Sequence, residues 1–234
     1  LILILVLGFA SGLPLLLTSS TLSIRLREAG VDLGAIGALS LVGIPYSLKF
    51  LWAPIIDNIR IPVLSTLFGR RRSWLLLLQA FLITAILALA FSEPSANLLY
   101  VTIAAIAVAF ASASYDIIVD AFRIEICDEK NMAAGAATYV YGYRIAMWLT
   151  GFSSLVIAQY FGWMVSYMVM ASFILVGTIT VLFTREPKAQ ETKQEDNSTP
   201  TANAYLDWLK TSIIDPFADF MKNPDWLIIL LFAV

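Results

Sequence analysis

The chain has 234 residues, 59% of them hydrophobic and 14% charged, with a formal net charge of −2 and a mean hydropathy of +0.81. Soluble proteins carry about 25% charged residues, and no soluble core of this length buries so much apolar surface. The composition therefore excludes a soluble protein and predicts an all-α protein in lipid. The sequence has no histidine and one cysteine, which removes the commonest metal ligand and any internal disulfide, and we expect neither metal nor cofactor.

Six stretches of the chain are apolar and long enough to span a bilayer. The first contains the small-residue pattern Gly8 to Gly12, which favours the close approach of a neighbouring helix, and Pro14, which predicts a kink. We assign residues 1–184 to one N-terminal bundle. Its six predicted spans are 1–23, 34–57, 73–92, 98–119, 132–160 and 161–184.

Lys49 lies inside the second predicted span, eight residues before Asp57. Eight helical residues cover about 12 Å, so the lysine starts well inside the apolar layer. Two interpretations remain open. Lys49 contacts a substrate, or its flexible side chain reaches back toward the membrane surface.

Asp116 and Asp120 lie four residues apart near the end of the fourth span, so on a helix they share one face. An acidic residue at the centre of a membrane costs about 2.5–3.5 kcal/mol. We interpret both as facing a polar cavity inside the bundle. The alternative for Asp120 is that it marks the end of the helix and pairs with Arg123 or with an arginine of a neighbouring helix.

Arg144 lies about 18 Å into the fifth span, near the middle of the bilayer. A guanidinium group there requires a carboxylate partner, which it binds in a bidentate way. We expect Asp116 to be that partner at rest and a bound carboxylate to replace it, whereupon Asp116, together with Asp120, takes up a proton. Tyr139 and Tyr143 share a helix face that suits sugar rings, or they serve only in packing.

The end of the sequence has a different character. Residues 185–224 form a polar connection that we expect to be a cytoplasmic linker. Within it, 205–221 recovers an apolar stripe at helical spacing, which predicts an amphipathic helix on the membrane surface or against protein. Residues 225–234 begin a seventh span, and we expect both ends of the chain to be cut.

Basic residues fall unequally on the two sides of the predicted bundle. The loops 58–72, 121–131 and 185–224 carry four, two and five Lys or Arg residues, whereas the other side carries only Arg25 and Arg27. Loops rich in Lys and Arg remain in the cytoplasm. We therefore expect both ends of the six-span bundle to be cytoplasmic.

Six spans, a long polar connection and the start of a seventh span resemble the N-terminal half of a major facilitator transporter. Five motifs resemble the AmpG-type muropeptide permease family of that superfamily. They are Leu7 to Pro14, Leu48 to Pro54 with Asp57, Phe68 to Arg72, Ala113 to Ala121, and Gly142 to Arg144. The chain departs from the family at Tyr115, where glutamine is common, and in its longer loop at 58–68.

The resemblance implies that Asp57, Gly69, Arg70, Arg71 and Arg72 latch a cytoplasmic gate. A carboxylate at a helix end that faces guanidinium groups of a neighbouring helix forms charge-assisted hydrogen bonds, which form in one state and break in the other. The alternative is that the arginines only set the orientation in the membrane.

The resemblance also implies a proton-driven importer of N-acetylglucosaminyl-anhydromuramyl peptides in the bacterial inner membrane, in contact with lipid and without nucleic acid. Such anionic glycopeptides suit the proposed substrate-binding residues, which are Arg144, Lys49, Tyr139 and Tyr143. One alternative is an acetyl-CoA-type or other anionic solute carrier. Another is a truncated remnant that lacks the C-terminal half, because alternating access requires both halves. We expect no enzyme, since neither a nucleophile–base pair nor a set of metal ligands is evident.

Overall fold

The structure is a computed structural model, and it describes residues 1–59, 61–62, 64–184, 186, 221–222 and 226. The chain divides into two compact units, Leu1–Gln190 and Glu191–Val234. Except for isolated positions, the predicted linker at 185–224, its amphipathic helix at 205–221 and the start of a seventh span at 225–234 lie outside the described residues. The fold described below is that of the first unit.

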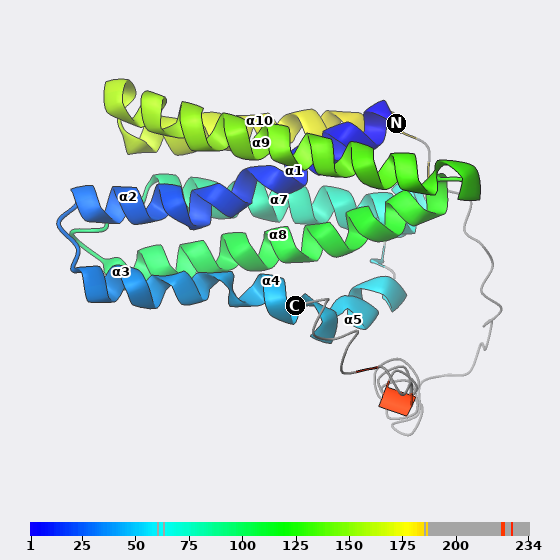
Figure 1. Cartoon of the computed structure of the whole chain (residues 1–234), viewed down its shortest axis with the longest axis horizontal. Helices are drawn as coiled ribbons and strands as arrows, with labels where there is room; N and C mark the ends of the chain where they lie inside the picture. The colour runs from blue at the N-terminus through cyan, green and yellow to red at the C-terminus, as the bar shows by residue number, and fades with distance from the viewer. Residues whose placement is uncertain (60, 63, 185, 187–220, 223–225, 227–234) are drawn as a thin grey trace. The chain divides into compact units, whose positions relative to one another are not determined.

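Every regular element among the described residues is helical, which confirms the predicted all-α class (Figure 1). The elements are, in chain order, α1 (Ile2–Thr18), α2 (Ser20–Glu28), α3 (Leu33–Leu39), η1 (Ser40–Gly43), α4 (Ile44–Leu48), η2 (Lys49–Leu51), α5 (Ala53–Asn58), α6 (Leu64–Phe68), α7 (Arg70–Ala90), α8 (Leu98–Ile126), η3 (Glu129–Asn131), α9 (Met132–Phe161) and α10 (Trp163–Phe183).

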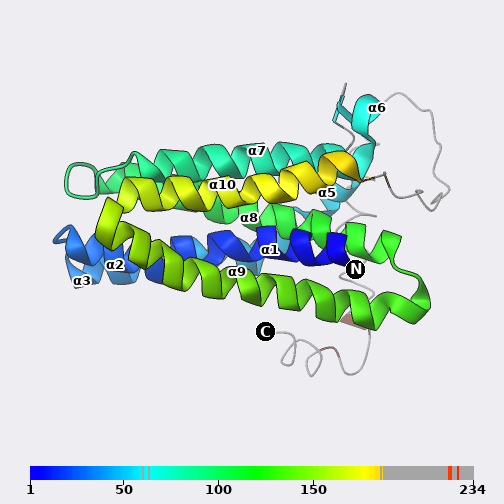
Figure 2. The ribbon, with the colours of Figure 1, turned by 90° about the horizontal axis from the view of Figure 1, so that it is seen from above.

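The long helices lie alongside one another, and α1 is in the middle of the bundle. It packs against α8, α9 and α10, while α7 packs against α8 and α10 (Figure 2). The contact of α1 with α9 is unusually close, because a Cβ atom added to Gly8 or Gly12 would collide with backbone of α9, and one added to Gly142 would collide with backbone of α1. The small-residue pattern of the first span therefore serves helix packing.

The first predicted span consists of two consecutive helices, α1 and α2. Helix α1 runs through Pro14 without ending, and the chain turns at Ser19, between α1 and α2. The hydroxyl of Thr18 donates to the carbonyl of Pro14 at 3.1 Å, and that of Ser19 donates to the carbonyl of Leu15 at 2.7 Å. These bonds occupy carbonyls of the last turn of α1.

The second predicted span is not one continuous helix. It consists of α3, η1, α4, η2 and α5. Only 11% of its apolar part, within Leu33–Leu51, is buried in the bundle. Pro45 and Pro54 lie in the first turns of α4 and α5, where proline is tolerated. The prolines therefore start short helices in place of one long helix.

Five helical segments of the described chain are long and apolar enough to cross a membrane: Ile2–Glu28, Leu33–Leu51, Arg70–Ala90, Leu98–Ile126 and Trp163–Phe183. The fifth span predicted from the sequence coincides with α9, which has 30 residues but is not among these five. Helix α8 continues to Ile126 and includes residues that the sequence places in a loop at 121–131. The additional helical residues include Arg123 and Glu125, both of which form ion pairs.

Candidate functional site

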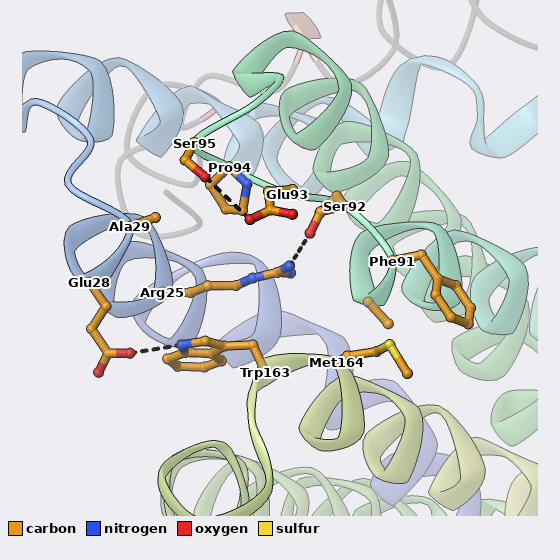
Figure 3. Close-up of a pocket in the computed structure, with 11 residues that line it drawn as sticks. Arg25, Glu28, Ala29, Phe91, Ser92, Glu93, Pro94, Ser95, Trp163 and Met164 are labelled. Atoms are coloured by element: carbon orange, nitrogen blue, oxygen red, sulfur yellow. Dashed lines mark hydrogen bonds between the residues drawn. The ribbon is translucent and has the colours of Figure 1, made fainter.

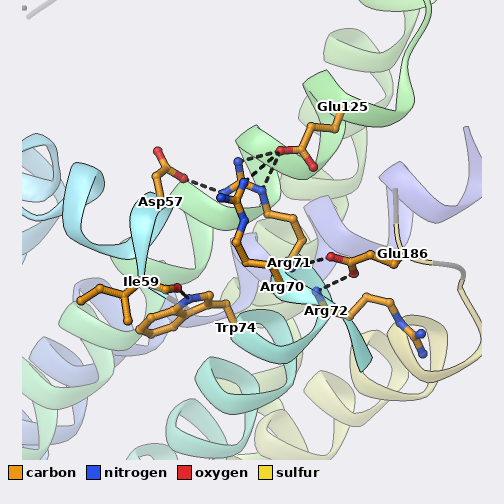
Figure 4. Close-up of polar contacts among 8 residues, drawn as sticks. All are labelled: Asp57, Ile59, Arg70, Arg71, Arg72, Trp74, Glu125 and Glu186. Carbon is orange, nitrogen blue, oxygen red and sulfur yellow. Dashed lines mark hydrogen bonds and ion pairs between the residues drawn. The ribbon is translucent and has the colours of Figure 1, made fainter. Parts of the chain in front are cut away.

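The predicted latch residues meet where α7 begins (Figure 4). Gly69 is the residue before α7, and its φ of +87° is a conformation that residues with a side chain rarely adopt. The side chain of Glu186 occupies the space in which a Cβ atom of residue 69 would lie. Both the backbone angle and this contact favour glycine at position 69.

Arg71 is the centre of the charge cluster. Its guanidinium group donates hydrogen bonds to Asp57 Oδ1 at 2.6 Å and to Glu125 Oε1 at 2.8 Å, and it forms an ion pair with Glu125 Oε1 at 2.7 Å. The Arg71 side chain is only 10% exposed, so solvent screens these contacts less than it screens surface ion pairs. One guanidinium thus joins α7 to both α5 and α8.

Glu186, which follows α10, binds the first turn of α7. Its two carboxylate oxygens accept the backbone N–H groups of Arg71 at 2.7 Å and Arg72 at 3.1 Å. In return, the Arg72 guanidinium donates to the carbonyls of Val181 at 3.1 Å and Leu182 at 2.8 Å, in the last turn of α10. An anion at a helix N-terminus and a cation at a C-terminus both compensate unpaired backbone groups.

We call Asp57, Arg71, Glu125 and Glu186 the latch cluster. The sequence predicts Asp57 and the arginines as latch residues but does not indicate either glutamate. The apolar run of the fourth span ends before Glu125, which predicts a loop there, and Glu186 lies in the polar connection. Arg70 is peripheral, at 4.0 Å from Glu125 with a side chain 35% exposed.

Asp116 lies inside the bundle on α8 and is 6% exposed. Its Oδ1 atom is buried and has no hydrogen-bond partner among the described residues. Ser11 of α1 and Tyr139 of α9 are polar neighbours of this carboxyl group, and the charges of Lys49 and Asp120 act on it. The structure therefore places Asp116 in a buried polar region, but without a close cation.

Asp120 differs from Asp116 although it is one turn away. Its side chain is 41% exposed and forms an ion pair with Arg123 at 3.1 Å. The Arg123 guanidinium also lies 5.9 Å from the centre of the Tyr139 ring. The alternative that Asp120 pairs with Arg123 is thus observed, although Asp120 does not mark the helix end, because α8 continues to Ile126.

The expected ion pair between Arg144 and Asp116 is not among those of the described residues, and Arg144 is exposed on α9. The reason is that Arg144 lies on the exposed side of α9, whereas Tyr139 of the same helix is a neighbour of Asp116. Tyr139 and Tyr143, as expected, neighbour each other on one face of α9, with ring centres 6.1 Å apart. Lys49 is half-buried in η2.

A cavity of about 490 Å³ lies near the ends of α2 and α7 and the start of α10 (Figure 3). Within it, Arg25 is 5% exposed and donates to the carbonyls of Leu89, at 2.7 Å, and Ser92. Its guanidinium lies 5.1 Å from the centre of the Tyr167 ring. The sequence predicts a loop position for Arg25. In the structure its side chain instead binds carbonyls at and just beyond the C-terminal end of α7.

The residues described by the structure include no group of three or more Cys, Asp or Glu side chains that is arranged to hold a metal ion. The chemistry that the two polar regions offer is therefore that of ion pairs and hydrogen bonds. The latch cluster holds helices together at one end. The region around Asp116 leaves a buried carboxyl oxygen without a partner.

Comparison with known proteins places these features in a family. Residues 1–234 match the sequence model described as Major Facilitator Superfamily. The chain is similar to Putative transporter AmpG 4 of Rickettsia felis, with 34% identity over 99% of this chain and 54% of the relative. It is similar to Anhydromuropeptide permease of Escherichia coli K12, with 39% identity over 99% of this chain and 44% of the relative. The chain spans about half the length of the curated relatives it matches.

Proposed function

Because this chain belongs to the Major Facilitator Superfamily, we propose that it forms the N-terminal half of a proton-driven transporter that imports anhydromuropeptides. Family membership and the long apolar helices identify it as a multi-pass protein of the inner membrane. The observation that carries the substrate proposal is the similarity to an anhydromuropeptide permease, which runs through 99% of the chain.

The latch cluster supports a gate at the predicted cytoplasmic end. Arg71 connects helices from three parts of the chain, so a movement of α5 or α8 relative to α7 must break charge-assisted hydrogen bonds. We propose that these bonds hold one conformation of the transporter and that transport breaks and remakes them. Gly69, Arg70 and Arg72 position the start of α7. When the gate opens, Asp57 is the group that separates from Arg71.

For proton coupling we propose Asp116, together with Asp120. The support is the burial of Asp116 in the bundle and its unpartnered Oδ1 atom. A carboxyl group with these properties changes its proton occupancy when its surroundings change. Asp120 is the outer member, with a side chain that is 41% exposed and paired with Arg123.

For substrate binding we propose Arg144, Lys49, Tyr139 and Tyr143. Arg144 lies on an α9 face that also exposes large apolar side chains, among them Trp148, which is 83% exposed. This face suits contact with the C-terminal half and with an anionic glycopeptide held between the two halves. Surrounding lipid completes the partners that we propose for the chain.

The test is uptake of labelled anhydromuropeptide into right-side-out vesicles that contain the complete product of the gene. We expect accumulation when a proton gradient is imposed, and only equilibration after the gradient is collapsed. Vesicles without the protein are the control for leakage. Absence of specific uptake, together with uptake of a different anionic solute, would overturn the substrate proposal and leave the family assignment intact.

A further inference from the structure

Four buried oxygen atoms on α1, α4 and α8 have no hydrogen-bond partner among the described residues. Their side chains include three that are almost fully buried, with Ser11 1%, Ser112 0% and Asp116 6% exposed. Buried polar groups are nearly always hydrogen-bonded, and an exception calls for an explanation such as a bound water or ion. The four atoms are Ser11 Oγ, Tyr46 OH, Ser112 Oγ and Asp116 Oδ1.

These four groups are neighbours. Ser112 and Asp116 lie one turn apart on α8, which packs against both α1 and α4. Ser11 interacts with the Asp116 carboxyl group, and Tyr46 interacts with Ser112 and with the charge of Asp116. The groups are thus near one another, yet none of these pairs has the geometry of a direct hydrogen bond, which is the arrangement that a bridging water produces.

We propose that Ser11, Tyr46, Ser112 and Asp116, the hydroxyl site, bind at least one internal water molecule that transfers protons to and from Asp116. The water passes one proton to Oδ1 while it takes up another from the aqueous side, and the reverse exchange releases the proton, so the water is unchanged and the proton gradient supplies the proton that is gained. This inference rests on the proposed proton-driven function. It goes further because it assigns Ser11, Tyr46 and Ser112 to the route by which protons reach the carboxyl group.

The charges around the hydroxyl site favour water over a metal cation. Asp116 is the only acidic member of the site, and the positive charge of Lys49 acts on it. Other titratable neighbours include Tyr115 and Asp120 on α8 and Tyr139 and Tyr143 on α9. A buried water needs two to four polar partners, and three hydroxyl groups with one carboxyl group supply them.

A structure of the complete transporter that resolves ordered waters tests the binding part. We expect density within about 2.7–3.2 Å of at least two of the four oxygen atoms, the hydrogen-bond distance of a bound water. Direct hydrogen bonds among the four side chains, without such density, would overturn the proposal. This experiment does not depend on transport, so it stands even if muropeptide is not the substrate.

The proton-transfer part is tested with Ser112→Ala and Tyr46→Phe, singly and together. Each removes one hydroxyl group, and we expect proton-driven accumulation to fall roughly tenfold in the double variant, equivalent to about 1.4 kcal/mol or one hydrogen bond. Exchange of labelled for unlabelled substrate without a gradient should stay unchanged. An equal loss of accumulation and exchange, or no loss of accumulation, would overturn the relay.

Ser172→Ala is the matched control for these variants. Ser172 is an exposed residue of α10 whose hydroxyl donates to the carbonyl of Val169 at 2.6 Å, far from any member of the hydroxyl site in sequence. Its replacement should change neither accumulation nor exchange. A loss of accumulation in this variant equal to that in Ser112→Ala would show that removal of any hydroxyl group has the effect, which contradicts the relay.

Discussion

Helix α8 carries two acidic residues whose surroundings are opposite. Glu125, in the latch cluster, accepts a hydrogen bond from the Arg71 guanidinium and forms an ion pair with it. Asp116, in the hydroxyl site, has an oxygen atom with no partner among the described residues. A paired carboxylate fixes the arrangement of helices, whereas an unpaired and buried one raises the energy of the arrangement that contains it. The latch cluster therefore stabilises one conformation, and the hydroxyl site responds to what binds there.

The largest effect on transport is expected from Asp116→Asn. The amide has nearly the shape of the protonated carboxyl group but cannot release a proton, so gradient-driven accumulation should be abolished while substrate exchange persists. Thermal stability in detergent should not fall, because no partner of Oδ1 is lost. If the variant still accumulates substrate against a gradient, the proton site lies elsewhere in the transporter.

Unlike Asp116→Asn, the substitution Arg71→Ala should strongly reduce thermal stability. Removing the guanidinium leaves Asp57 and Glu125 without their partner, and breaking a buried pair costs about 3–5 kcal/mol, less here because the Asp57 side chain is 41% exposed. Thermal unfolding in detergent measures the effect. Arg71→Lys is the control, because it keeps the charge but cannot contact Asp57 and Glu125 at the same time in the way that the guanidinium does. We expect its stability to be intermediate. Equal stability of Arg71→Ala and the unchanged chain would contradict the latch.

Gly69→Ala tests whether the start of α7 must keep its backbone conformation. The backbone of Gly69, with φ +87° and ψ 169°, costs a residue with a side chain about 1–3 kcal/mol, and the new methyl group would also displace Glu186. Unfolding should therefore occur at a lower temperature than in the unchanged chain. Glu186→Gln separates the two causes, because it keeps the shape and removes only the charge at the helix N-terminus. If Gly69→Ala has no effect on stability, the contact with Glu186 is not maintained in the membrane.

The smallest effect is expected for Asp120→Asn. Its pair with Arg123 spans three residues of one helix and is half-exposed, and such pairs contribute about 0.2–0.5 kcal/mol. We expect almost unchanged stability and a partial loss of accumulation, measured in the same vesicles as Asp116→Asn. A loss as complete as that of Asp116→Asn would mean that the two aspartates act as one proton site.

Local features of this chain were predictable from its sequence. The apolar runs locate the long helices, and Gly8 and Gly12 predict the close contact of α1 with a neighbour. The resemblance to the major facilitator family also identifies Asp57 and Arg71, which the fold brings together. In each case the signal lies within one helix or in one loop between consecutive helices.

Contacts between distant segments were not predictable in the same way. Glu186 is 115 residues from Arg71, and nothing in the local sequence indicates that it binds the start of α7. The expected pairing of Arg144 with Asp116 is based on charge and depth alone, and it is wrong because Arg144 lies on the exposed side of α9. The breaks in the second span depend on how Pro45 and Pro54 begin new helices, which an average of hydropathy does not record.

The glycine contacts between α1 and α9 have a mechanical consequence. Where the backbones of α1 and α9 are in contact, no layer of side chains lies between them that could deform. We therefore expect these two helices to move together as one rigid unit. Arg144 and Ser11 are both carried by that unit, while Asp116 belongs to α8. A displacement of α9 relative to α8 would therefore also change the position of Ser11 relative to Asp116.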